Sequence, residues 1–476
     1  MRKPRVFLAS VGRRPLGYPF TSPPLGILYL AAYLRSKFPV ELKVVNQRAE
    51  ECTEDDLVRQ IVEFESDAVG FSVMTTCSQA LGELTRKVRR ALPRALIVLG
   101  GPHVSSFEEE AIRDTEADAA VAGEGELALE AVLRARFDGQ DFSHIPGLLW
   151  RTPDGRVVTN PGRLPAIDDL DSLPFPAYDL IDLSAYWKLH SLAPIARRKY
   201  ISLISSRGCP YHCIWCHNIF GKRFRPHSSE RIVEEMGYFT KKYGIKDVEL
   251  LDDVFNLDHG RVIEVCEGIH RRNLRVKIAL PNAVRTDILT QEVVDALVDA
   301  GWYFSGFALE TGSPRLQELT GKRLSIPKFL EGVRMAVRKG VFAYGFAMLG
   351  HPTETEAELQ QTIDTMVKSE AHLASFFTVI PFPKTRLYDM AMERMPERLR
   401  GVRYAGETYA SIRVNLSDVP DEVLFAYQRK AYREFYLSPR RVLRIVRHYP
   451  KPLELPSYLP IFLRRATKGL LSRKGG

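Results

Sequence analysis

The sequence predicts an α/β protein in which a doubly wound, flavodoxin- or Rossmann-like domain is followed by a full or partial TIM-type (β/α) barrel and a helical C-terminal region. Two separate stretches in which short β-branched runs alternate with helical patterns support this fold class. The length of 476 residues supports it too, because one ordinary hydrophobic core does not extend over so long a chain.

The first alternation contains five candidate strands, and amphipathic helical patterns lie between them. The strands are expected at 5–10, 42–46, 68–73, 95–101 and 118–123. Alternation at this spacing predicts a parallel sheet covered on both faces. A hairpin that turns at Pro153-Asp154-Gly155 and a proline-containing linker follow. We therefore expect a first domain over 1–145, and a hairpin and linker over 146–195.

The second alternation is expected to form a barrel domain over 196–384. Its six candidate strands are at 199–208, 246–253, 275–280, 302–309, 342–349 and 374–383. Six βα units suit a full or partial barrel. The last part, 385–476, is less regular, and we expect a helical accessory region there.

The composition, 45% hydrophobic and 26% charged, is typical of a globular protein. Six cysteines are too few for a disulfide scaffold and favour a reducing compartment. No stretch reaches the roughly 18 uninterrupted apolar residues of a membrane helix. These observations predict a cytoplasmic protein.

Positive charge is concentrated at the C-terminus. The formal net charge is +9, and residues 437–476 contain ten Lys or Arg and one acid, Glu454. This segment is either a solvated basic tail or one that rests on an anionic membrane surface or meets an acidic substrate. Because no surface of alternating basic and aromatic side chains is recognisable, we expect no nucleic-acid partner.

Three cysteines are crowded into the stretch "SSRGCPYHCIWCHN". Cys209, Cys213 and Cys216 follow the first strand of the predicted barrel, at the end where such folds carry their chemistry. Thiolates are the usual ligands of iron–sulfur clusters, and three of them leave one iron of a four-iron cluster open. The alternative is a structural zinc site of the Cys3His type that uses His212 or His217.

The C-x3-C-x2-C spacing, with Trp215 before the third cysteine, resembles the radical S-adenosylmethionine superfamily. The resemblance implies a [4Fe-4S] cluster held by Cys209, Cys213 and Cys216, and S-adenosylmethionine bound through its amino and carboxylate groups to the open iron. It implies that one electron cleaves the sulfonium and yields a 5′-deoxyadenosyl radical. It also implies that Trp215 packs beside the adenine.

Two later strand ends match the same superfamily. The second barrel strand ends "ELLDDVFN", and the resemblance implies that Asp252 and Asp253 meet the methionine amine. The fourth ends "FALETGSPRLQELTGKR", where Glu310 occupies the position that contacts the ribose. Lys322 or Arg323 would assist it.

A third match ends the fifth barrel strand. The stretch "FAMLGHPTET" is similar to the superfamily pattern M-x-G-x-P-x-E-T. The resemblance implies that the backbone at Gly350 approaches the adenine, and Thr355 completes the pattern. A zinc knuckle does not account for these three strand ends.

The first predicted domain is similar to the cobalamin-binding domain of one large radical subclass, at 22–35, 70–75, 98–105 and 121–126. The resemblance implies that small groups at the carboxyl ends of strands approach the corrin: Ser72, Thr75, Gly100 and Gly101. The loop "VNQRAEECTED" lacks the histidine of the D-x-H-x-x-G pattern, so no histidine of this loop would hold the lower face of cobalamin. His103 is expected to be a polar wall. The alternative is a flavodoxin-like domain without a corrinoid.

The resemblance as a whole implies a cobalamin-dependent radical enzyme, most simply a C-methyltransferase that acts on an unactivated carbon. A small-molecule or lipid-like substrate and a reducing partner such as flavodoxin or ferredoxin are expected. Radical oxidative cyclisation or rearrangement is an alternative within the subclass. A tRNA methylthiotransferase would need three further cysteines in the first domain, which has only Cys52 and Cys77. A zinc-stabilised nucleic-acid-binding protein is the non-enzymatic alternative. Cys52, Cys77 and Cys266 are expected to be buried packing residues.

Overall fold

The computed structural model describes residues 2–14, 20–195, 198–217, 219–406, 412–449, 453 and 455–456. Its contacts divide the chain into two compact units. Unit 1 comprises Met1–Ser191, His217–His227 and Arg403–Ile412, and unit 2 comprises Leu192–Cys216, Ser228–Val402 and Arg413–Gly476.

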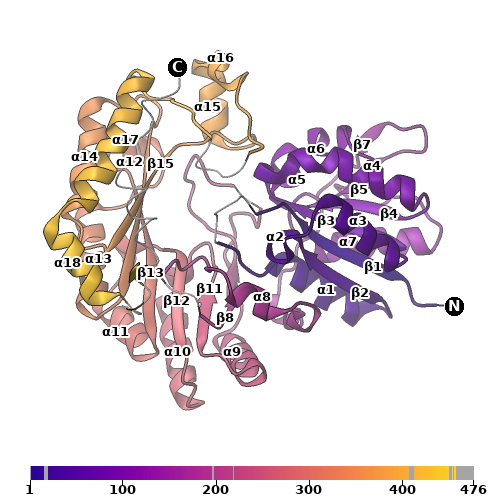
Figure 1. Cartoon of the computed structure of the whole chain (residues 1–476), viewed down its shortest axis with the longest axis horizontal. Helices are drawn as coiled ribbons and strands as arrows, with labels where there is room; N and C mark the ends of the chain where they lie inside the picture. Colours follow the sequence, from indigo (N-terminus) through magenta and orange to yellow (C-terminus); the bar gives the residue numbers. More distant parts are fainter. Residues whose placement is uncertain are drawn as a thin grey trace. The chain divides into compact units, whose positions relative to one another are not determined.

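Unit 1 contains a seven-stranded sheet (Figure 1). Its strands are β1 (Arg5–Val11), β2 (Glu41–Asn46), β3 (Ala68–Val73), β4 (Leu96–Gly100), β5 (Ala119–Ala120), β6 (Leu149–Arg151) and β7 (Val157–Thr159), in the order β2-β1-β3-β4-β5-β6-β7. The first five run parallel, and the hairpin β6–β7 adds antiparallel strands at one edge. The order 2-1-3-4-5 confirms a doubly wound sheet. Successive strands are added toward one edge up to β2 and toward the other edge from β3 onward, so the topological switch point lies between β1 and β3.

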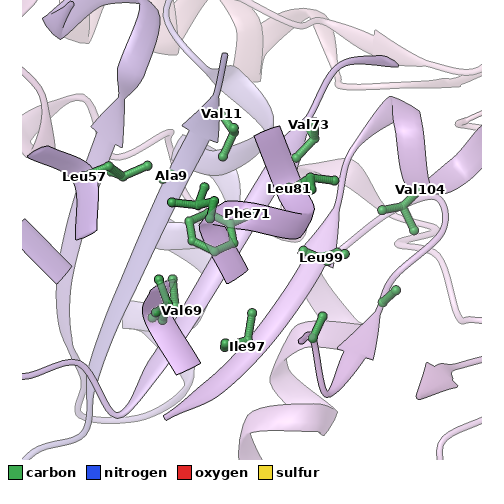
Figure 2. Packing of buried hydrophobic residues seen from close by; sticks show 14 of the residues in the cluster. Ala9, Val11, Leu57, Val69, Phe71, Val73, Leu81, Ile97, Leu99 and Val104 are labelled. Atoms are coloured by element: carbon green, nitrogen blue, oxygen red, sulfur yellow. The ribbon is translucent and has the colours of Figure 1, made fainter. Parts of the chain in front are cut away.

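Helices cover both faces of this sheet, as Figure 1 shows. They are α1 (Leu25–Lys37), α2 (Gln47–Glu50), α3 (Glu54–Glu63), α4 (Leu81–Ala91), α5 (Pro102–Phe107), α6 (Glu109–Arg113) and α7 (Glu126–Phe137). Figure 2 shows the core on one face, where Leu57 of α3 and Leu81 of α4 pack against Phe71 and Val69 of β3. Burial of these apolar side chains holds the helices to the sheet.

Unit 2 contains an open sheet of six parallel strands, which confirms the partial barrel. The strands are β8 (Tyr200–Leu203), β11 (Asp247–Leu250), β12 (Lys277–Val284), β13 (Trp302–Glu310), β14 (Phe342–Leu349) and β15 (Leu373–Thr378). The intervening helices are α9 (Ser229–Tyr243), α10 (His259–Arg271), α11 (Gln291–Asp299), α12 (Pro314–Leu319), α13 (Ile326–Arg338) and α14 (Glu356–Lys368). In Figure 1 they line the outer face of the sheet. Because the six strands run parallel, their carboxyl ends meet at one edge.

A helix covers the open edge at β15. The hydroxyls of Tyr436 and Tyr432 on α17 (Asp421–Tyr436) accept hydrogen bonds from the backbone N–H groups of Ala374 and Phe376, at 3.0 and 3.2 Å. The Tyr436 hydroxyl also donates to the Ala374 carbonyl at 2.7 Å. Side chains of α17 thus satisfy backbone groups that a further strand would otherwise pair.

Candidate active site

The cysteine loop follows β8 and the two-residue strand β9 (Ser206–Arg207) at the carboxyl edge of the unit 2 sheet. Cys209, Cys213 and Cys216 are all free thiols. The backbone of Ile214 fixes the loop on two sides, because its N–H donates to the Thr320 carbonyl at 3.0 Å and its carbonyl accepts from the Leu387 N–H at 2.9 Å. The loop is therefore held in place by its surroundings.

The segment after α12 packs directly against the cysteine loop. Gly321 has a φ of +66°, and a Cβ there would lie 2.7 Å from the carbonyl oxygen of His212. Only glycine accepts both the left-handed backbone and the close approach. This contact brings the following residue, Lys322, to the cysteines.

Arg285 supports the loop from the end of β12, a contact that the sequence did not reveal. Its guanidinium lies 3.9 Å from the ring centroid of Tyr211, between the first two cysteines. Its Nε donates to Asp287 at 2.9 Å, and its backbone N–H donates to the Asn256 side chain at 2.8 Å. A cation held over an aromatic ring in this way restricts the orientation of both groups.

The thiols of the loop differ electrostatically from those elsewhere in the chain. A hydrogen bond from Cys216 lowers the pKa of Cys213 to about 7 against the effect of burial, and Lys322 and Arg285 add to the lowering. The same hydrogen bond raises the pKa of Cys216. By contrast, burial raises the pKa of Cys52 to about 11 and that of Cys266 to about 12. Of these four thiols, that of Cys213 has a pKa near neutral pH.

The donor set fits a cubane iron–sulfur cluster. Three soft sulfur donors lie on one braced loop, and two cations act on them. In the part of the chain that the structure describes, no three His, Cys, Asp or Glu side chains are grouped so as to hold a single metal ion. A four-iron cluster is held differently, because each of its irons takes one cysteine and the three sulfurs lie further apart than around a single ion. The geometry lends no support to the zinc alternative.

Asp252 and Asp253, expected together at the methionine amine, lie in different surroundings. Asp252 is buried and accepts hydrogen bonds from the hydroxyls of Ser205 and Ser206 at 2.9 and 2.5 Å. Burial raises the pKa of Asp252, while Arg261 and the two serines oppose the rise. Asp253 is exposed. Asp252 thus ties β11 to the start of the cysteine loop, and Asp253 alone faces outward.

Glu310 ends β13 with a φ of +67° and forms an ion pair with Lys322, whose Nζ lies 3.6 Å from Oε1. Each side chain is 13% exposed. Burial raises the pKa of Glu310, and Lys322 counteracts this rise. Arg323 instead pairs with Glu318 at the surface. Of the two basic residues considered from the sequence, Lys322 is the one at Glu310.

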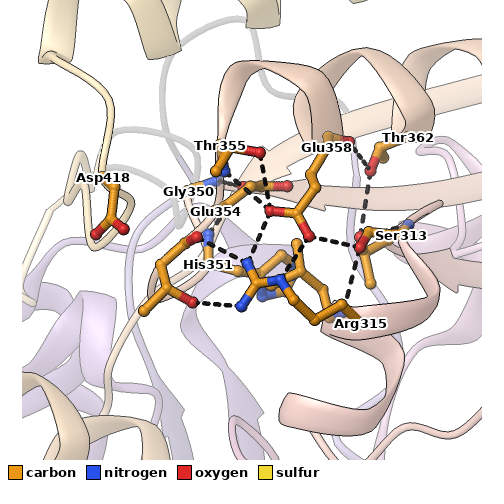
Figure 3. Close-up of polar contacts among 12 residues, drawn as sticks. Ser313, Arg315, Gly350, His351, Glu354, Thr355, Glu358, Thr362 and Asp418 are labelled. Atoms are coloured by element: carbon orange, nitrogen blue, oxygen red, sulfur yellow. Dashed lines mark hydrogen bonds and ion pairs between the residues drawn. The ribbon is translucent and has the colours of Figure 1, made fainter.

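The loop after β14 turns at Gly350, which has a φ of +88° (Figure 3). A carboxylate oxygen of Glu354 accepts from the backbone N–H groups of Gly350 and His351, at 2.6 and 3.0 Å. Burial raises the pKa of Glu354 to about 8, so the carboxyl group is largely protonated at neutral pH. The glutamate of the motif therefore shapes the turn.

Thr355 begins α14 and belongs to a neighbouring polar network, also shown in Figure 3. Its N–H and hydroxyl donate to Glu358 at 3.1 and 3.0 Å, and Arg315 donates to the same carboxylate at 2.7 and 2.8 Å. Although burial acts in the other direction, hydrogen bonds from Arg315, Ser313 and Thr355 lower the pKa of Glu358 to about 2. Thr355 therefore positions the helix start.

His351, which the sequence did not single out, lies against Trp215, the residue predicted to pack beside the adenine. Its ring centroid is 5.7 Å from that of Trp215, and the ring planes are inclined by 51°. The imidazole is fully buried, and within the described residues neither ring nitrogen makes a well-formed hydrogen bond. Burial lowers the pKa of His351 to about 4, so the ring is neutral at pH 7.

In unit 1, three of the four predicted corrin-contacting residues lie half-buried at the carboxyl edge of the sheet: Ser72, Gly100 and Gly101. Gly101 has a φ of +89°, and a Cβ there would lie 2.7 Å from the Ser72 hydroxyl. The fourth, Thr75, is buried. Met74, which the sequence did not indicate, is 39% exposed beside the β1/β3 switch point, where ligands of doubly wound folds bind.

His103 follows Gly101 on α5 and is buried against Phe107, with ring centroids 4.8 Å apart. Burial lowers the pKa of His103 to about 4, so this histidine too is neutral. The loop after β2 forms α2, and Gln47 accepts from the Gly12 N–H at 2.8 Å. Cys52 belongs to the hydrophobic core, and Cys77 packs against it. Both cysteines therefore serve packing, in contrast to the ligands of a second iron–sulfur cluster.

Comparison with known proteins identifies the family. A model of the B12 binding domain matches residues 17–133, and a model of the Radical SAM superfamily matches residues 203–366. An uncharacterized methyltransferase of Pyrococcus horikoshii is 31% identical over 455 residues, which cover 95% of this chain and 94% of the relative. The chain belongs to the cobalamin-binding radical S-adenosylmethionine enzymes.

Relatives of lower identity are named for different reactions. A cytidylyl-2-hydroxyethylphosphonate methyltransferase of Streptomyces wedmorensis is 25% identical over 76% of this chain and 77% of its own length. An anaerobic magnesium-protoporphyrin IX monomethyl ester cyclase of Rubrivivax gelatinosus is 24% identical over 77% of this chain and 66% of its own length. The structure of the radical S-adenosylmethionine methyltransferase TsrM from Kitasatospora setae, with cobalamin and a [4Fe-4S] cluster bound, has the same fold. Its TM-score is 0.71 at 18% identity, over 93% of this chain and 90% of TsrM.

Membership of the cobalamin-binding radical enzymes confirms the predicted family and fold class. It also confirms the predicted set of cofactors: cobalamin, S-adenosylmethionine and a [4Fe-4S] cluster.

Proposed function

We propose that the protein is a cobalamin-dependent radical S-adenosylmethionine enzyme that methylates an unactivated carbon of a small-molecule substrate. The observation that carries this proposal is the braced C-x3-C-x2-C loop at the carboxyl edge of a partial barrel, in a chain that also contains a B12-binding domain. When bound, the cluster, S-adenosylmethionine and cobalamin would supply one electron, a 5′-deoxyadenosyl radical that removes a hydrogen atom, and a methyl group.

The residues of unit 2 take the binding and positioning roles. We assign the cluster to Cys209, Cys213 and Cys216, and we assign the side of the adenine to Trp215 and the backbone at Gly350. Glu310, held by Lys322, would accept hydrogen bonds from the ribose hydroxyls, since a paired carboxylate keeps its orientation. Asp253 would meet the methionine amine. Asp252 is a positioning residue, because its oxygens are engaged by the serines that precede the cysteines.

In unit 1 we assign the corrin to the carboxyl edge of the sheet, at Ser72, Gly100 and Gly101. The buried side chain of Thr75 would act through the start of the 3-10 helix Thr75–Ala80, which it begins, and Met74 would present its thioether to the ligand. A thioether is soft and apolar, which suits contact with a large flat macrocycle. This arrangement needs no histidine from the loop after β2.

The inner face of the barrel supports a substrate with an apolar part. A Cβ at Gly345 would lie 2.5 Å from the Met366 sulfur of α14, so this residue faces the outer helices and its neighbours Tyr344 and Phe346 face inward. The Phe346 ring lies against Gly306 of β13, where a Cβ would come within 2.7 Å of it. The absence of a side chain at Gly306 thus leaves space for the Phe346 ring on the barrel wall.

Strand β15 continues this aromatic wall. The Tyr344 hydroxyl forms a 2.6 Å hydrogen bond with Ser375, which places alternate residues of β15 on the inner face. Phe377, two residues later, is 39% exposed, and its ring centroid lies 6.4 Å from that of Phe346. An exposed phenylalanine inside a barrel favours a substrate that buries it.

Anaerobic reconstitution with cobalamin, labelled S-adenosylmethionine and a flavodoxin or ferredoxin system tests the function. We expect both 5′-deoxyadenosine and S-adenosylhomocysteine to form, and we expect Cys216→Ala to form no 5′-deoxyadenosine, because cleavage to the radical needs the cluster electron. A cytoplasmic location is part of the proposal, because such electron carriers work there. Absence of 5′-deoxyadenosine from cluster-loaded enzyme would overturn the proposal.

Radical cyclisation or rearrangement is the second candidate, because a relative of 24% identity is named as a cyclase. The same experiment separates the two functions. Formation of 5′-deoxyadenosine without transfer of the labelled methyl group favours cyclisation or rearrangement.

A further inference from the structure

Within the described residues, helix α18 (Pro439–His448) is buried through Arg441 and Ile445. Its Arg441 is buried, and the guanidinium donates to the carbonyls of Ser369 and Val367 at 3.0 and 2.7 Å, and also to that of Ala371. Ile445, one turn further along, is buried on the same face. Arg441 thus caps the C-terminal end of α14 and sets the rotation of α18 about its axis.

The outward face of α18 carries an apolar stripe. Val442, Leu443 and Val446 are 48%, 68% and 47% exposed. They lie three and four residues apart, so they share one side of the helix. Exposed single apolar residues are common, but three together on an anchored helix form a surface that a partner would cover.

A basic stripe runs beside the apolar one. Arg440, Arg444 and Arg447 repeat at the same three- and four-residue spacing. No acidic residue occurs from Leu437 to Tyr449. The helix therefore presents arginines next to valines and a leucine, the combination found in helices that lie in the interface of an anionic bilayer.

We propose that α18 is a docking helix for an anionic lipid surface. Val442, Leu443 and Val446 enter the acyl boundary, and Arg440, Arg444 and Arg447 meet lipid phosphates. A second copy of this chain is the poorer occupant, because the same arginines would then face one another. No helix among the described residues is long and apolar enough to cross a bilayer, so the contact is made at its surface. This proposal does not depend on the catalytic function.

The basic segment predicted from the sequence extends past this helix. Its part beyond Tyr449 lies outside the described residues, except for 453 and 455–456. Leu453 is 97% exposed. Four of the ten basic residues of 437–476 lie on α18 itself: Arg440, Arg441, Arg444 and Arg447. Of these four, Arg441 is the one whose guanidinium is bound to backbone carbonyls at the end of α14.

Sedimentation of the full chain with lipid vesicles tests the proposal, in the absence of cofactors and substrate. We expect binding to phosphatidylglycerol-containing vesicles, weakening as salt rises, and little binding to pure phosphatidylcholine. Leu443→Ser with Val446→Ser should weaken binding about tenfold. Replacing Arg440, Arg444 and Arg447 by Gln should weaken it by roughly fivefold per charge.

A control places one change of each kind on unit 1, with Val62→Ser on α3 and Arg90→Gln on α4, both at exposed positions. This control should bind vesicles as the parent chain does. Circular dichroism and a thermal melt establish that each variant is folded. No binding by the folded parent chain, or equal binding by the α18 variants, would overturn the proposal. So would a change from dimer to monomer in the serine variant, which would assign the face to a second copy.

Discussion

The indole of Trp215 lies 5.7 Å from the imidazole of His351, and this contact joins the cysteine loop to the loop after β14. Both ring nitrogens of the buried imidazole lack a well-formed hydrogen bond among the described residues. In the folded apoprotein the ring therefore acts mainly through its shape.

Replacing His351 separates the contribution of the ring's shape from that of its nitrogens. We expect His351→Phe to keep or raise the free energy of unfolding, because the phenyl ring fills the space without burying nitrogens that lack a well-formed hydrogen bond. His351→Ala should lower it by about 3 kcal/mol through the cavity it leaves under Trp215. Urea unfolding of the apoprotein measures both. If His351→Phe is stable but binds S-adenosylmethionine poorly, the nitrogens serve the cofactor; if it unfolds readily, the packing argument is wrong.

Replacing a loop cysteine should remove the cluster. We expect about four irons and four sulfides per reconstituted parent chain, and a large loss of both in Cys213→Ala. Cys52→Ala is the matched control, because burial raises the pKa of this core thiol to about 11 and it should bind no iron. Iron and sulfide analysis with visible spectroscopy measures the loss. Equal loss in the control would mean that the assignment of the ligands is incorrect.

The adjacent aspartates should behave differently. Asp252→Ala removes the acceptor for Ser205 and Ser206 and a carboxylate that interacts electrostatically with the buried Arg261. We expect a loss of about 3 kcal/mol in the free energy of unfolding. Asp253→Ala, at an exposed position, should change it by about 0.5 kcal/mol or less. Equal losses in the two variants would contradict the division of roles argued above.

Lys322 and Arg323 form a second matched pair. Lys322→Met removes the partner of a mostly buried carboxylate, so we expect a tenfold weaker affinity for S-adenosylmethionine, or about 1.4 kcal/mol. Arg323→Met removes only a surface ion pair and should change the affinity less than about twofold. Anaerobic titration calorimetry on cluster-loaded protein measures both. A strong effect of Arg323→Met alone would reverse the assignment.

The pH dependence of stability should report Glu354. Its folded-state pKa, about 8, is above the ordinary value of 4.5, so the folded protein binds more protons than the unfolded chain between these pH values. The stabilisation is fully present below pH 4.5 and is lost as the pH rises through about 8. Within this window Glu354→Gln should gain on the parent chain by up to about 1.4 kcal/mol per pH unit. Urea unfolding of both proteins from pH 5 to 8.5 measures the difference, and parallel curves would disprove a raised pKa.

Local patterns determined much of this protein. The two strand–helix alternations predicted both sheets, since hydrophobic periodicity depends on residues close in the chain. The cysteine spacing and the strand-end motifs likewise lie within single loops, so the candidate site could be located without the structure. The strand expected at 118–123 is shorter than predicted, because only Ala119 and Ala120 pair with their neighbours.

Contacts between distant segments were decided only by the tertiary structure. The separation of Asp252 from Asp253, the selection of Lys322 at Glu310, and the placement of His351 behind Trp215 all depend on how loops far apart in sequence pack together. The exposed stripe of α18 depends on Arg441, which turns the helix by capping α14. The sequence by itself determined which chemistry the chain can hold. The fold determined which side chains lie beside the cysteine loop, because burial and hydrogen bonds between segments far apart in the chain fix the position of each side chain.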